Sequence, residues 1–182
     1  MLAAYDLAID TFVPMLSSLK NILVKGAEYA KAKGFDSAVL VQARLAADMF
    51  PLSQQVLLAC HHAQDGVARL TGGRSEPAGA PDTTYDALLA RVDRTIDRVR
   101  RAPQAAFEGA ESRDIRMPFP AAGIAFEMNG AQFVRDWALP QFYFHLVTAY
   151  GILRHNGVEI GKADYAGIAG PYIRPVSEAS HS

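Results

Sequence analysis

The sequence predicts a mainly α-helical protein, a four-helix bundle with a short β-hairpin before the last helix. Four long segments repeat apolar residues at three- and four-residue spacing, which is the period of a helix buried along one face. Between the third and fourth segments the apolar period shortens to two residues, as in a strand. The chain of 182 residues suits one domain. We expect the bundle to occupy residues 1–168 and a flexible tail to occupy residues 169–182.

The first two long helices have clear boundary residues. The first carries its apolar stripe over residues 5–30 and should end before Gly34. A short helix should follow, with Asp36 at its N-terminus. The second long helix should begin near Pro51, because proline is tolerated in a first turn, and stop at the glycine pair 72–73, because glycine adopts the backbone that ends a helix.

A polar loop over residues 73–83 precedes the third helix, which Thr83 or Thr84 can cap. The inward positions of this helix are apolar. Its outward positions carry arginine and aspartate, a pattern typical of a solvated face.

The hairpin is predicted from two alternating runs on either side of residues 120–123. Closing this four-residue loop places residues of similar character opposite each other: Phe119 with Ile124, Met117 with Phe126, Ile115 with Met128, and Arg116 with Glu127 on the other face. Because an isolated hairpin is marginally stable, we expect its apolar face to pack on the helices.

The last helix carries a polar pair in an apolar row. Asn129 can cap it, Pro140 should kink it, and it should end near His155. One side of the helix holds residues at four-residue spacing, namely Phe133, Trp137, Gln141, His145 and Ala149. An imidazole and an amide therefore lie one turn apart, and buried polar groups need partners.

His145 has several candidate partners. They are Gln141, water, a metal ion, and four polar residues of the second helix: Gln54, Gln55, His61 and His62. On an ideal helix, His62 and Gln55 flank the apolar stripe, whereas His61 and Gln54 point away from it. Helical geometry therefore favours His62.

The composition excludes several classes of partner. Lysine and arginine total 18 against 19 acidic residues, which argues against binding to nucleic acid or to an anionic membrane. The single cysteine, Cys60, cannot form an internal disulfide, and its apolar surroundings predict an inert thiol. We find no membrane-length apolar run and no basic signal-peptide start, and we expect a cytoplasmic protein.

Two runs of sequence carry a family resemblance. LPQFYFHLVTAYGILRHNGV (residues 139–158) and RLAADMFPLSQQV (residues 44–56) resemble a bacterial domain-of-unknown-function family allied to the DinB/YfiT-like superfamily. The resemblance covers residues 3–168. It implies a four-helix bundle with a long crossover, often a homodimer. In several such proteins three histidines bind a divalent metal, and some relatives transfer or isomerise groups with a low-molecular-weight thiol.

The resemblance also implies which residues correspond to the metal ligands. His145 matches the second histidine of the last-helix pair, and Gln141 stands in place of the first. The second-helix ligand falls at residues 54–55, both glutamine, and His61 and His62 follow about two turns later. With His145, these two histidines are the candidate ligands for Zn or Ni. Because glutamine is a poor ligand for either metal, the resemblance implies a degenerate site.

Three functions are open at this stage. The first is a dimeric protein that binds a small apolar or thiol-containing ligand beside His145, Gln141 and Trp137. The second is a metal-dependent, thiol-linked transferase or hydrolase that uses the histidines named above. The third is a structural protein that self-associates through apolar surface including Leu57 and Leu58.

Overall fold

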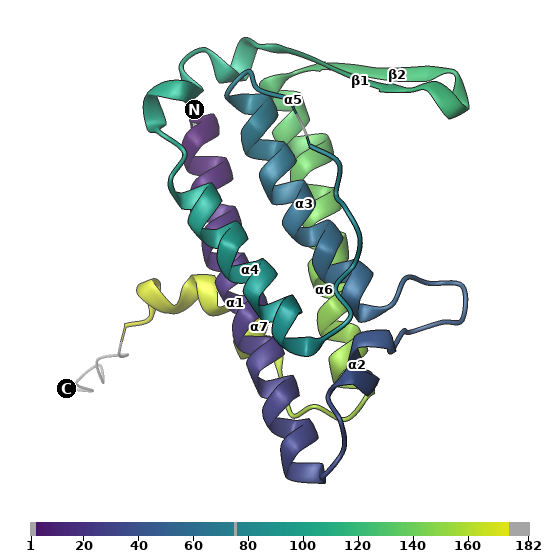
Figure 1. The fold of residues 1–182 in the computed structure, drawn as a ribbon. Helices are drawn as coiled ribbons and strands as arrows, with labels where there is room; N and C mark the ends of the chain where they lie inside the picture. Colours follow the sequence, from purple (N-terminus) through teal and green to yellow (C-terminus); the bar gives the residue numbers. More distant parts are fainter. Residues whose placement is uncertain (1–2, 75, 175–182) are drawn as a thin grey trace, which may run out of the picture.

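The computed structural model describes residues 3–74 and 76–174 and shows a four-helix bundle with a hairpin extending from one end (Figure 1). The four helices are α1 (Ala4–Lys33), α3 (Leu52–Leu70), α4 (Tyr85–Arg100) and a last helix made of α5 (Gly130–Phe133), the π-helical turn η4 (Val134–Ala138) and α6 (Leu139–His155). Helix α3 packs against α4 and α6, and α1 packs against α4. The predicted fold class is confirmed.

The helices end where the sequence indicates. Helix α1 stops at Gly34, whose φ of 74° is left-handed and favours glycine. The short helix α2 (Ala38–Gln42) follows, and Asp36 accepts a hydrogen bond from the amide of Ala38 at 2.8 Å. Thr84 accepts one from the amide of Ala87 at 3.3 Å, which caps α4.

The last helix begins with a capping box. Asn129 Oδ1 accepts from the amide of Gln132 at 2.9 Å, and Gln132 Oε1 accepts from the amide of Asn129 at 3.0 Å. The π-helical turn ends two residues before Pro140, the residue at which we predicted a kink. Proline has no N–H to donate to the preceding turn, and a π-helical turn accommodates one extra residue in a helix.

The hairpin has the predicted register. Strands β1 (Asp114–Phe119) and β2 (Ile124–Asn129) are antiparallel, with Phe119 opposite Ile124 and Arg116 opposite Glu127. Ile115 and Met117 are buried in the core, but the side chains near the tip are 37–53% exposed: Phe119, Ile124 and Phe126. The prediction that the apolar face packs on the helices is therefore correct for the base of the hairpin only.

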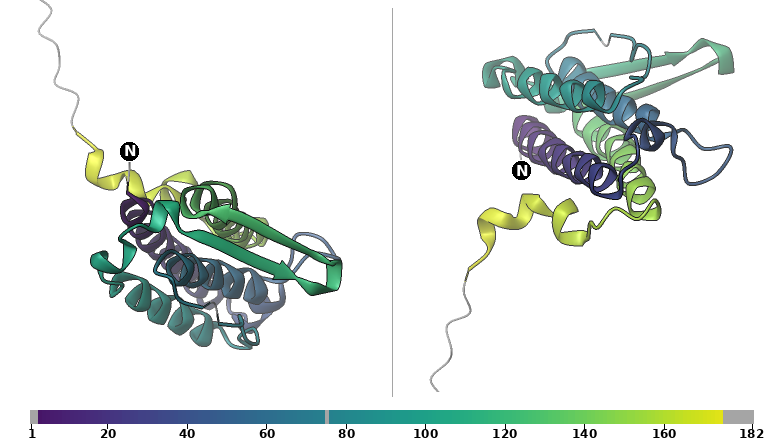
Figure 2. Two further views of the ribbon diagram at one scale, coloured as in Figure 1. Left: turned by 90° about the horizontal axis from the view of Figure 1, so that it is seen from above. Right: turned by 60° about the horizontal axis from the view of Figure 1, so that its bottom comes forward.

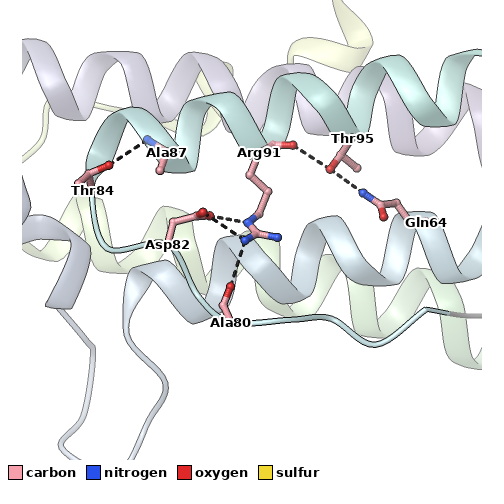
Figure 3. A network of polar contacts seen from close by, with 7 residues as sticks. All are labelled: Gln64, Ala80, Asp82, Thr84, Ala87, Arg91 and Thr95. Atoms are coloured by element: carbon pink, nitrogen blue, oxygen red, sulfur yellow. Dashed lines mark hydrogen bonds and ion pairs between the residues drawn. The ribbon is translucent and has the colours of Figure 1, made fainter.

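Arg91 on α4 binds the loop between α3 and α4 (Figure 3). The guanidinium of Arg91 donates to the carboxylate of Asp82 and to the carbonyl of Ala80, the latter at 3.1 Å. Leu57, a predicted partner-facing residue, is only 1% exposed and lines a small cavity together with loop residue Pro77. Burial within its own chain removes Leu57 from the candidate surface for self-association.

Cys60 lies on the buried side of this region. Beside it, Thr95 accepts a hydrogen bond from Gln64 at 2.9 Å and donates one to the carbonyl of Arg91 at 2.9 Å (Figure 3). Burial raises the pKa of the Cys60 thiol to about 11, because the charged thiolate is poorly solvated there. The thiol is therefore protonated at neutral pH, which agrees with the prediction of low reactivity.

Short helices follow α6. They are α7 (Lys162–Tyr165) and the 3₁₀ helix η5 (Gly167–Tyr172), and both contact α1. This segment and the hairpin lie on opposite sides of the bundle (Figure 2). The predicted tail therefore begins within a 3₁₀ helix, and residues 175–182 lie outside the described residues.

The expectation that no apolar run reaches membrane length is wrong for helix α1, which is long and apolar enough to cross a membrane, by length and composition alone. Half of that apolar window is buried inside the protein, where Phe12 packs edge-to-face on Phe142 with ring centroids 5.0 Å apart. The apolar character of α1 is thus used in the bundle core. The cytoplasmic location and the homodimer stay predictions.

Tyr85 presents a buried hydroxyl with no hydrogen-bond partner in the described part of the chain. Gly26 of α1 lies against this hydroxyl, and a β-carbon there would overlap it. We expect Tyr85→Phe to raise the free energy of unfolding by about 1 kcal/mol, because it removes a buried polar group that gains nothing from burial. Urea unfolding checks this value, and a loss of more than about 1 kcal/mol would show that the hydroxyl has a partner in solution.

Candidate functional site

A buried hydrogen-bond chain orients His145. This residue lies on α6 and is 7% exposed, and its Nδ1 is 2.7 Å from Oε1 of Gln55 on α3. Gln55 Nε2 donates to the backbone carbonyl of Phe50 at 3.1 Å, which directs the amide oxygen toward the imidazole. Because an amide oxygen only accepts hydrogen bonds, Nδ1 of His145 carries the proton.

The imidazole of His145 is neutral at pH 7. Burial lowers its pKa to about 4, because the charged form loses solvation. With the proton on Nδ1, Nε2 bears the lone pair, and this atom makes no hydrogen bond within residues 3–74 and 76–174. His145 can therefore accept a hydrogen bond through Nε2.

His62 stacks on His145. The two rings are parallel within 7°, and their centroids are 5.4 Å apart. Burial, and then the nearby His145 and His61, lower the pKa of His62 to about 4, while Asp65 acts in the opposite direction. Nδ1 of His62 is buried and lacks a hydrogen-bond partner among the described residues. An unpaired buried polar atom in a native fold calls for a missing partner.

A groove of about 420 Å³ lies between α3, the hairpin and the last helix, and we call it the His62 groove. Its lining residues are Leu58, His61, His62, Asp65, Arg69, Ala78, Met117, Pro118, Phe119, Trp137 and Gln141. The aromatic wall is itself packed, since the Trp137 ring lies 5.9 Å from Phe119 and 4.9 Å from Phe126, centroid to centroid. The groove therefore combines a firm apolar wall with a row of polar side chains from α3.

The structure brings several of the predicted residues together, although His145 itself is not among the residues that line the groove. Trp137 and Gln141 line the groove, and Gln55 is the hydrogen-bond partner of His145. Gln54 is only partly buried and, like Gln141, makes no hydrogen bond with His145. His62, the partner that helical geometry favoured, contacts His145 by stacking instead.

Several lining residues were not predicted as site residues from the sequence, among them Asp65, Arg69, Met117 and Phe119. Asp65 and Arg69 continue the face of α3 that carries His62, at steps of three and four residues, so helical spacing could have found them. The hairpin residues carried no such signal, because their apolar face was expected to be covered.

A family model described as a domain of unknown function (DUF1993) matches residues 4–166. The chain belongs to the DUF1993 family. A crystal structure of a DinB family member protein from Shewanella denitrificans is 40% identical to it, with a TM-score of 0.81 over 94% of this chain and 95% of that chain. No match is found among curated proteins. The family resemblance predicted from the sequence is confirmed.

The donor set of this DUF1993 chain does not fit a divalent metal. The lone pair of an imidazole nitrogen lies in the ring plane, and the stacked planes of His62 and His145 are nearly parallel, so the two lone pairs do not converge on one point. Nδ1 of His145 is already committed to Gln55. In the described ranges, no group of three or more His, Cys, Asp or Glu side chains is arranged to hold a metal ion.

Proposed function

We propose that the protein binds a small, mainly apolar molecule with a hydroxyl group in the His62 groove. The observation that carries this proposal is the imidazole of His62, which burial keeps neutral and which lines a groove with aromatic walls. A hydrogen bond between the ligand and this ring would contribute about 0.5–1.5 kcal/mol.

The chemistry of the neutral imidazole indicates a hydroxyl. A neutral ring nitrogen either donates or accepts one hydrogen bond, depending on the tautomer, and a hydroxyl can serve in both roles. Stacking on His145, which Gln55 holds in place, limits the freedom of the His62 ring. A ring whose orientation is already restricted loses less conformational entropy when a ligand binds.

The remaining lining supports binding of a small molecule. A volume of about 420 Å³ lies in the range of ligand sites, which are mostly apolar with a few placed polar groups. Met117, Phe119 and Trp137 supply the apolar and aromatic surface, and the Gln141 amide can pair with a further polar group.

The single tryptophan of the chain gives a direct test, because Trp137 lies in the groove. We expect 2-naphthol to quench Trp137 emission in a saturable titration. His62→Leu should weaken this binding about tenfold, since it removes a hydrogen bond of about 1.5 kcal/mol. The matched control is His155→Leu at the exposed end of α6, which should bind as the wild type does. Absence of saturable binding, or equal affinity in the His62→Leu variant, would contradict the proposal.

A further inference from the structure

We infer that the ligand of the His62 groove also carries a carboxylate, which the guanidinium of Arg69 binds. The inference rests on the proposed function and specifies the class of its ligand. Among the described residues, Arg69 donates through Nε alone, to both oxygens of Asp65 at 2.7 and 3.0 Å. Its two Nη atoms make no hydrogen bond in the part of the chain that the structure describes.

Asp65 holds this guanidinium in a fixed place. The pair is spaced i, i+4 on α3, and the side chains are 23% exposed for Arg69 and 7% exposed for Asp65. Both residues line the groove. A guanidinium held through Nε presents its remaining donors as a planar fork, a geometry that matches the two oxygens of a carboxylate.

The charges along the groove favour an anion over a cation. Asp65 and Arg69 are the only charged side chains among the lining residues, and the carboxylate of Asp65 is already paired. Burial lowers the pKa of His61, as it does that of His62, so both rings are neutral at pH 7. The unsatisfied charged donors therefore belong to Arg69. Asp65 lies close enough to repel a second carboxylate in part, and we expect a moderate gain in affinity.

The distance between His62 and Arg69 along α3 sets the length of the ligand. Arg69 is seven residues beyond His62, which is two turns and about 10 Å along the helix axis. A hydroxyl that pairs with His62 and a carboxylate that pairs with Arg69 would then stand at opposite ends of an apolar body, which contacts Trp137 and Phe119. An aromatic hydroxycarboxylate has this arrangement.

The test compares 6-hydroxy-2-naphthoate with 2-naphthol, by Trp137 fluorescence and by calorimetry. We expect the added carboxylate to strengthen binding about tenfold in the wild type. Arg69→Gln should abolish this gain, so that 6-hydroxy-2-naphthoate and 2-naphthol bind this variant with equal affinity. Because Arg69→Gln leaves Asp65 buried without its cation, the double variant Asp65→Asn/Arg69→Gln is measured beside it. Arg116→Gln, an exposed arginine on the hairpin, is the matched control and should keep the full gain.

The outcomes separate this inference from the proposed function. If both compounds bind equally, or if the gain persists in both Arg69 variants, the carboxylate assignment is wrong while the groove remains a binding site. If neither compound binds the wild type, the proposed function and this inference both fail. A gain that depends on Arg69 supports the inference.

Discussion

Replacing Gly130 with alanine is expected to lower the free energy of unfolding by at least about 3 kcal/mol. A β-carbon at this position would overlap the backbone carbonyl oxygen of Ala110. Gly130 is buried at the start of the last helix, directly after the cap residue Asn129. The β-carbon is fixed in position by the backbone of Gly130, and the carbonyl oxygen is itself a backbone atom. No side-chain rotation therefore relieves the contact, and one of the two backbone segments has to move.

Urea unfolding followed by circular dichroism measures this effect. The matched control is Gly151→Ala in α6, where the new methyl group would lie 3.3 Å from Cδ1 of Leu45, an exposed and movable side chain. We expect the control to be neutral or up to about 1 kcal/mol more stable, because alanine favours the helix. Equal stability in both variants would show that Gly130 and the carbonyl of Ala110 do not pack against each other as described.

Gly130 also shows where sequence reasoning reaches its limit. The Asn129 cap and the hairpin register were predicted because both follow from residues close together in the chain. The approach of Gly130 to Ala110 joins residues twenty positions apart, and nothing in the local pattern marks it. Local rules therefore give the elements, whereas the close contacts between them depend on packing.

The candidate site was likewise predictable only in part. The inward position of His145 followed from the apolar row on the last helix. The hydrogen-bond partner of His145 could not be predicted in this way. Whether Gln55 or His62 occupies that position depends on the rotation of α3 against α6. The groove could not be predicted, because the exposed half of the hairpin forms one of its walls. Phe119 belongs to this wall because the apolar face of the hairpin extends beyond the helices.

Acidification from pH 7 to pH 4 is expected to destabilise the protein, with about 3 kcal/mol of the loss due to His145. The pKa of about 4 in the folded protein is below the ordinary value of 6.5. As the pH falls below 6.5, the unfolded chain takes up a proton and the folded protein does not, so the free energy of unfolding decreases. The decrease from this residue levels off below pH 4, once His145 of the folded protein is protonated as well. His62 acts in the same direction.

The contribution of His145 can be isolated with His145→Asn, measured by urea unfolding at several pH values. Asparagine does not titrate, and its amide nitrogen can donate to Gln55 as Nδ1 does. The variant should lose about 3 kcal/mol less than the wild type between pH 7 and pH 4. His155→Asn, at the exposed end of α6, is the control and should keep the wild-type profile. Carboxylates also titrate near pH 4, but they do so in all three proteins, so the difference between profiles cancels their effect. If the His145→Asn profile matched the wild type, the His145 ring would already be solvated in the folded protein, and the stacked pair that holds His62 in the groove would not exist in solution.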